Sequence, residues 1–145
     1  MTPKERAQSV ADHMWAADQA SPWFGMELAE IDEGRAVLTL TVAAHHLNGH
    51  GICHGGVIFA LADSAFAFAC NSRNQSTVAQ HNTITYISPA QPGDRLTASA
   101  REITLTGRSG LTDVTVTNQT GAVIAEFRGA SRTLKGQVCS QEIET

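Results

Sequence analysis

The most apolar stretch of the chain lies near its middle, where residues 57–70 read VIFALADSAFAFAC. Only Asp63 and Ser64 are polar there, so a helix over these residues is apolar on nearly every side. Such a helix is enclosed by its own protein. At about 1.5 Å per residue it spans about 21 Å, which is too short to cross a bilayer. The pattern therefore predicts a buried central helix that carries one carboxylate.

A second helix is predicted at the N-terminus. Thr2 and Glu5 stand three residues apart, as in a capping box, with Pro3 at the first helical position. The residues that share one apolar face are Val10, Ala11, Met14 and Trp15. Because proline interrupts a helix, Ser21-Pro22 is expected to end this one.

Alternating apolar and polar residues predict strands on both sides of the central helix. Residues 26–42 hold two alternating runs joined near Gly34, a pattern typical of a β-hairpin. Three further stretches cover residues 77–88, 95–106 and 111–134, and the last contains a turn at Thr120-Gly121. Their β-branched residues and turn signals predict antiparallel strands joined by short hairpins.

This order of elements predicts an α+β fold, in which an antiparallel sheet of about five to six strands buries one face against the central helix. With 145 residues, 42% of them hydrophobic, the chain is long enough for one core. We assign one domain to residues 1–134. Residues 135–145 lack periodicity and are expected to form a flexible tail.

Charge and cysteine content narrow the classes of partner. The net charge is -4 and no basic cluster occurs, which argues against nucleic acid as a partner. The first residues are polar and no apolar run reaches about 18 residues, so we expect a cytoplasmic protein with no membrane partner. The three cysteines form no CxxC pair and are predicted to be reduced thiols.

The start of the central helix resembles a binding site. Gly55 and Gly56 precede the apolar run, so their amides lie near the N-terminus of the helix, where unpaired donors and the helix dipole favour negative charge. Such amides can polarise a carbonyl or stabilise an oxyanion. A plain turn is the alternative for the glycines, and a structural acid is the alternative for Asp63.

Gly55 and Asp63 are too far apart to act together within one chain. They are eight residues apart, which is roughly 12 Å along a helix axis. A base and an oxyanion donor must both lie about 3 Å from one reacting group. If they cooperate, Gly55 of one subunit faces Asp63 of another across a two-fold axis, which gives two sites per dimer.

Residues 46–70, HLNGHGICHGGVIFALADSAFAFAC, resemble the signature of hotdog-fold thioesterases, in particular the PaaI-like branch of phenylacetic acid degradation. Residues 84–100, ITYISPAQPGDRLTASA, resemble the strand and turn that follow in the same family. The resemblance implies a long central helix wrapped by an antiparallel sheet, with a homodimer as the minimal active unit and a homotetramer expected. It also implies hydrolysis of acyl-CoA to free CoA and a carboxylic acid, without a cofactor. Phenylacetyl or hydroxyphenylacetyl groups are favoured, and medium-chain fatty acyl groups stay open.

The same resemblance implies roles for four residues. Asp63 corresponds to the catalytic carboxylate, as general base or nucleophile, and the Gly55 amide to the donor that polarises the thioester carbonyl. Asn48 would orient substrate or water, and His54 would hold the loop. The family often adds a Ser or Thr on the next strand; Ser76 and Thr77 are the nearest candidates, but the register of that strand is open.

Residues for substrate binding are predicted with less support from the pattern. The phosphates of CoA need cations, and Arg95, Arg128, Arg132 and Lys135 are candidates, although each would otherwise be an ordinary solvated charge. The predicted substrate-binding residues are Gly56, Phe59, Thr77, Arg128 and Arg132.

Three alternative functions compete with this interpretation. The first is a metal site built from His45, His46, His50, Cys53 and His54, but their spacing matches no standard zinc motif, and we predict no metal. The second is nucleophilic catalysis by Cys53 with His54, although neighbouring residues on a turn generally point apart. The third is a non-catalytic module that binds acyl-CoA on the same fold.

Overall fold

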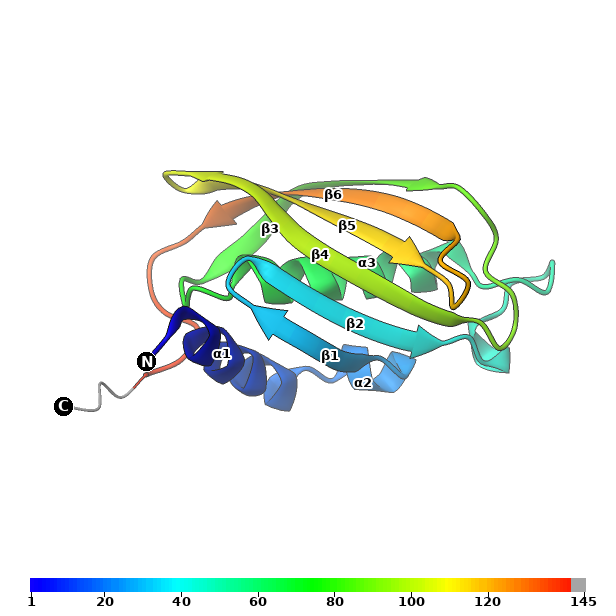
Figure 1. Ribbon diagram of the computed structural model, residues 1–145, viewed down its shortest axis with the longest axis horizontal. Coiled ribbons are helices and arrows are strands. Elements are labelled where there is room, and N and C mark those ends of the chain that lie inside the picture. Colours follow the sequence, from blue (N-terminus) through cyan, green and yellow to red (C-terminus); the bar gives the residue numbers. More distant parts are fainter. Residues whose placement is uncertain (142–145) are drawn as a thin grey trace.

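The computed structural model describes residues 1–141, which form one sheet and the helices packed on it (Figure 1). The helices are α1 (Pro3–Ala17), α2 (Ala20–Phe24), the short 3-10 helix η1 (Ala44–His46) and α3 (Gly55–Cys70). The strands are β1 (Glu27–Asp32), β2 (Arg35–Thr41), β3 (Thr77–Tyr86), β4 (Arg95–Thr106), β5 (Ser109–Thr117) and β6 (Val123–Thr133). The predicted α+β class, with a long central helix against an antiparallel sheet, is confirmed.

The sheet has six strands in the order β1-β2-β4-β5-β6-β3. The predicted hairpins β1–β2, β4–β5 and β5–β6 are present, and Gly34 turns the first of them at φ +70°. The expected hairpin between β3 and β4 is wrong, because β3 pairs with β6 instead. β2 and β5 occupy both edges of β4, so β3 does not pair with β4 and lies instead at the edge of the sheet beside β6.

The N-terminal helices differ from the prediction at their junction. α1 ends at Ala17, and a separate short helix, α2, runs through Pro22. Proline fits there because it lies in the first turn, where no intrahelical acceptor exists for an amide hydrogen. Asp18 connects the two helices, since its carboxylate accepts from the Ser21 amide at 2.9 Å.

The core lies between α3 and the inner face of the sheet, as Figure 1 shows with α3 behind the strands. Gly129 of β6 makes this contact close, because a Cβ there would collide with the Phe66 ring of α3. The helix is less enclosed than its composition predicts: Gly56 is exposed, and Ala60, Asp63 and Ala67 are half-buried. These four residues recur at helical spacing, so one face of α3 is not covered by its own chain.

The C-terminal residues follow the body of the protein as far as they are described. Asn74 holds the Cys139 backbone through both its amide nitrogen and its amide oxygen, at 2.9 and 3.0 Å. Gln141 donates to the Arg6 carbonyl at 3.3 Å. Residues 142–145 of the expected tail lie outside the described residues.

No helix in the described part of the chain is long and apolar enough to span a membrane.

Candidate active site

The N-terminus of α3 presents one amide without a protein acceptor. His54 caps the helix: its Nδ1 accepts from the Gly56 amide at 2.8 Å, and its carbonyl accepts from the Val57 amide at 3.0 Å. Within residues 1–141, no group accepts a hydrogen bond from the Gly55 amide. This amide is therefore a donor at the positive end of the helix dipole, available to a ligand.

The loop before α3 is fixed by hydrogen bonds on several sides. The His54 amide donates to the His46 carbonyl, and the Cys53 amide to the Ala90 carbonyl, both at 2.8 Å. Asn48 closes a tight turn, because its Oδ1 accepts from the His50 amide at 2.9 Å. The buried His46 ring is held at Nε2 by the Phe24 carbonyl at 2.7 Å. The loop is thus connected both to α2 and to the segment after β3.

Tyr86, the last residue of β3, lies against the start of α3. Its hydroxyl donates to the Gly55 carbonyl at 2.8 Å. A Cβ on Gly55 would lie 3.1 Å from the Tyr86 ring, so the glycine allows this contact. Beside it is an open pocket of about 310 Å³, whose lining includes Asn48, Ile58 and Ala90. The pocket is lined by residues of the loop 47–54, of α3 and of the segment after β3.

Asp63 lies in the middle of α3 on its half-buried face, with Asn82 of β3 as its hydrogen-bond partner. Asn82 Nδ2 donates to Asp63 Oδ1 at 3.1 Å. Burial raises the pKa of Asp63 above its ordinary value, and the hydrogen bond from Asn82 opposes that rise. A carboxyl group with a raised pKa is better matched to proton transfer than an ordinary surface aspartate.

The structure does not bring Gly55 and Asp63 of one chain to the same pocket. Asp63 is absent from the lining of the pocket beside Gly55. Both residues belong to one continuous helix, so they are separated by roughly 12 Å along its axis. Asn48, His54 and Gly55 do gather at one place, at the start of α3.

The predicted substrate-binding residues are spread over the molecule. Gly56 is in the first turn of α3, and the Phe59 ring packs on Phe127 with centroids 5.5 Å apart. Thr77 begins β3 near the other end of α3, where its amide donates to Asn71. Its hydroxyl donates to the Gln75 carbonyl and not to Asp63.

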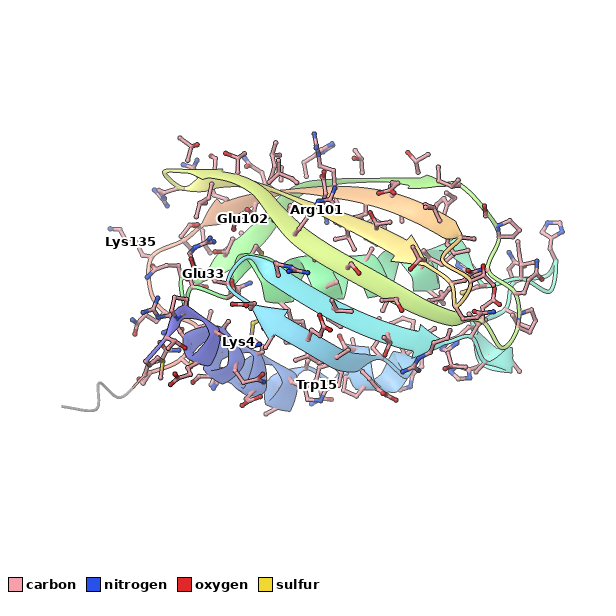
Figure 2. All side chains as sticks on the ribbon, in the orientation of Figure 1. Lys4, Trp15, Glu33, Arg101, Glu102 and Lys135 are labelled. Carbon is pink, nitrogen blue, oxygen red and sulfur yellow. The ribbon has the colours of Figure 1, made fainter. Side chains whose placement is uncertain are left out.

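None of the candidate cations is among the residues that line the pocket. Arg128 makes a two-pronged ion pair with Asp113 at 2.6 and 2.9 Å. Arg132 contacts Ser109 at 3.3 Å, and Arg95 lies 3.4 Å from the Glu27 carboxylate. Lys135 is at the end of the molecule opposite the pocket loop (Figure 2).

The histidines and the cysteine of the loop do not converge on one point, although the rings of His45 and His46 lie with their centroids 4.1 Å apart. His46 is buried between Phe24 and Ala43, whereas His50 is exposed. Across residues 1–141, no three His, Cys, Asp or Glu side chains are grouped so that they could hold a metal ion. Burial raises the pKa of Cys53 to about 11, so its thiol is protonated at neutral pH.

Sequence analysis missed two residues at this site, Asn82 and Tyr86. Asn82 could not be assigned because the register of its strand against α3 is a matter of tertiary contact. One signal was present: counting back by twos from Tyr86 places Ile84 and Asn82 on the same face of the strand.

Comparisons with known proteins agree with this geometry. A family model described as "Thioesterase superfamily" matches residues 50–125. The chain is 40% identical over 136 residues to acyl-coenzyme A thioesterase PaaI of Escherichia coli (strain K12), covering 94% of this chain and 97% of that protein. It is 33% identical over 98 residues to human acyl-coenzyme A thioesterase 13, covering 66% of this chain and 70% of that protein.

Solved structures of thioesterases superpose on this chain. The E. coli PaaI protein, described as part of the phenylacetic acid degradation operon, superposes with a TM-score of 0.92 over 94% of this chain and 99% of its own. A hypothetical thioesterase protein of Streptococcus pneumoniae TIGR4, solved with coenzyme A, is 26% identical. It superposes with a TM-score of 0.73 over 77% of this chain and 90% of its own.

Proposed function

Because this chain belongs to the thioesterase superfamily, we propose that it hydrolyses acyl-CoA thioesters to free CoA and a carboxylic acid. The observation that carries the proposal is the presence of two chemically complementary groups on α3. One is the Gly55 amide, which has no acceptor within residues 1–141, and the other is Asp63, a carboxyl group whose pKa is raised. They match the two needs of thioester hydrolysis, a donor for the carbonyl oxygen and a base for water.

The chemistry assigns each group a step. The carbonyl oxygen accepts from the Gly55 amide, which stabilises the negative charge that develops there. Asp63 takes a proton from water as the water oxygen attacks the carbonyl carbon. The carbon–sulfur bond then breaks, and the departing thiolate of CoA receives the proton. If Asp63 is instead the nucleophile, an anhydride forms first and water hydrolyses it. Neither route needs a cofactor.

The proposed active unit is a homodimer, with Gly55 of one subunit and Asp63 of the other at each site. Three features support it. β3 is an edge strand paired on one side only, so its second side is open to another strand. Its apolar side chain Val78 and the following Ile87 are exposed. The uncovered face of α3 consists of small residues around Asp63, which allow close approach of a partner. A homotetramer of two such dimers is proposed from the family resemblance.

The proposed acyl group is aryl-acyl, either phenylacetyl or hydroxyphenylacetyl, in a cytoplasmic enzyme. The description of E. coli PaaI as part of the phenylacetic acid degradation operon supports this choice. The pocket beside Gly55 agrees with it, because Ile58, Pro89 and Ala90 give it an apolar wall. Medium-chain fatty acyl groups are the alternative. Arg128 and Arg132 would serve the phosphates of CoA only if Arg128 exchanges Asp113 for the ligand.

Thiol release from a panel of acyl-CoAs tests the proposal. The panel contains phenylacetyl, hydroxyphenylacetyl, benzoyl, short-chain and medium-chain thioesters. We expect Asp63→Asn to lower kcat by about 10²–10⁴-fold. Asp12→Asn is the matched control, because Asp12 is an exposed carboxylate whose partner is Gln8. If the wild type binds acyl-CoA without releasing thiol, the chain is a binding module and the proposal fails.

Isotope labelling tests the nucleophilic route. Single turnover in ¹⁸O-labelled water places label in the Asp63 carboxylate if that group is the nucleophile and water attacks its carbonyl carbon in the anhydride. Label in Asp63 therefore demonstrates the nucleophilic route, whereas label only in the acid product arises either from the general-base route or from water attack on the acyl carbon of the anhydride.

A further inference from the structure

Asn82 supplies the only hydrogen bond that residues 1–141 make to the Asp63 side chain. The bond joins Asn82 Nδ2 to Asp63 Oδ1, and it crosses from the edge strand β3 to α3. Within the same residues, Asp63 Oδ2 has no hydrogen-bond partner. One carboxylate oxygen is thus held and the other is left for a reacting group.

The position of Asn82 in the sheet explains how it reaches Asp63. Its cross-strand partner is Gly129, which has no side chain and thereby leaves the inner face of the sheet open beside Asn82. The Phe66 ring fills the space over Gly129. Asn82 is half-buried there, whereas its neighbour Thr83 is exposed and pairs with Arg128 of β6. Alternation along the strand therefore places Asn82 toward α3 and Thr83 away from it.

The Asn82 amide also has an unused acceptor. Its Oδ1 is buried and has no hydrogen-bond donor in the described part of the chain. A buried acceptor without a partner costs free energy, so packing alone does not account for an amide at this place. An amide both donates and accepts. It can therefore pair with ionised Asp63 through Nδ2 and, after rotation, with the protonated acid through Oδ1.

We propose that Asn82 is a positioning residue for thioester hydrolysis, which orients the Asp63 carboxylate and pairs with it in both protonation states. The inference rests on the proposed function. It gives the support of Asp63 to an asparagine on the strand after the helix, where the family resemblance implies a serine or threonine that positions the water. Among residues 1–141, neither Ser76 nor Thr77 hydrogen-bonds to Asp63.

Other titratable groups near α3 are occupied or face elsewhere. On the neighbouring strands, Glu102 binds Arg73 at 2.7 Å, Asp113 binds Arg128, and His81 is exposed. On α3 itself, Cys70 is buried and its pKa is raised to about 12, so it carries no charge at neutral pH. Burial and Asn82 are therefore the influences that set the pKa of Asp63.

The test compares the pH dependence of hydrolysis in Asn82→Leu, Thr83→Val and the wild type. Leucine has the same branched arrangement of side-chain heavy atoms as asparagine, with larger methyl groups at its end, and cannot hydrogen-bond. Thr83→Val changes the outward neighbour. We expect Asn82→Leu to lower kcat by about tenfold to a hundredfold, as misplacement of a reacting group does, with KM within about twofold. Its acid limb should move to higher pH, because the bond from Asn82 to the ionised carboxylate is stronger than the bond to the protonated acid, and losing both raises the pKa of Asp63.

The outcomes of this test distinguish failure of the role given to Asn82 from failure of the proposed function. The inference is overturned if Asn82→Leu keeps the kcat and the acid limb of Thr83→Val while Asp63→Asn is inactive. The proposed function fails instead if the wild type releases no thiol. Thermal melting and size-exclusion chromatography report whether Asn82→Leu folds and assembles. If it does not, Asn82→Ser is measured in its place, since its hydroxyl is too short to make the bond and the same changes are expected.

Discussion

Gly55 and Asp63, the two groups of α3 to which the proposal gives a role, are held very differently. At its N-terminus, the backbone around Gly55 is fixed by the His54 cap, the Tyr86 hydroxyl and the bond from Cys53 to Ala90. In the middle of the helix, the Asp63 side chain makes one hydrogen bond within residues 1–141, to Asn82. The Gly55 backbone is therefore fixed from several sides, whereas the Asp63 carboxylate is held at one oxygen.

The difference matches the different requirements of an oxyanion donor and a general base. An oxyanion donor is effective when its direction is fixed before the reaction, because no reorganisation is then needed. A base must instead exchange a proton with water, so one carboxylate oxygen has to stay accessible. The half-buried face of α3 around Asp63 provides that access, and a second subunit placed there would bring the fixed donor to it.

The largest effect expected at the donor end comes from removing the Gly55 amide hydrogen. Gly55→Pro does so without breaking the helix, because proline is favoured at the first helical position and His54 before it is already extended, at ψ 134°. We expect kcat to fall by about 10²–10³-fold. Gly55→Ala is the control, since it adds the same Cβ beside Tyr86 but keeps the amide hydrogen. Equal activity of the two variants would remove Gly55 from the mechanism.

A smaller effect is expected from the cap itself. His54→Ala removes the acceptor of the Gly56 amide, and loss of an N-cap costs about 0.5–2 kcal/mol. For a chain of this size that lowers Tm by about 2–4 °C per kcal/mol, measured by thermal melting. Since the Gly55 amide is kept, kcat should fall less than in Gly55→Pro. An unchanged Tm would mean that His54 does not fix this end of the helix.

The smallest effect is expected on thermal stability, from replacing the Asp63 carboxylate. Burial raises the pKa of Asp63, so the folded state disfavours the ionised carboxylate. This lowers the free energy of unfolding at any pH above the raised pKa. The effect disappears below the pKa of an aspartate in the unfolded chain, about 3.9, because Asp63 is then protonated in both the folded and the unfolded state. Asp63→Asn should therefore raise Tm at neutral pH, and the gain should shrink as pH falls through the raised pKa. A lower Tm for Asp63→Asn at neutral pH would contradict a destabilised carboxylate.

Sequence patterns predicted the local features of this molecule better than its long-range contacts. The central helix, the face of α1 formed by Val10 and Ala11, and the turn at Gly34 follow from periodicity and glycine geometry, and all three are present. The resemblance to hotdog-fold thioesterases is confirmed, because its motif is local and specific.

The remaining features depend on contacts between distant segments. The pairing of β3 with β6 joins two strands that are far apart in the sequence, and the local sequence of β3 does not contain that information. The bond from Asn82 to Asp63 depends on the same register. α2 differs from the prediction for a local reason: Pro22, which is expected to end a helix, lies in the first turn of one.

A mixing experiment tests the central claim, that Gly55 of one subunit acts with Asp63 of another. Gly55→Pro and Asp63→Asn proteins, each inactive alone, are mixed in equal amounts under conditions that exchange subunits. Acyl-CoA hydrolysis is then measured. In a mixed dimer with shared sites, one site carries both substitutions and the other carries neither, so random exchange restores about a quarter of wild-type activity. If each chain builds its own site, every site in the mixed dimer has one defect. Full subunit exchange without recovery of activity would contradict the account.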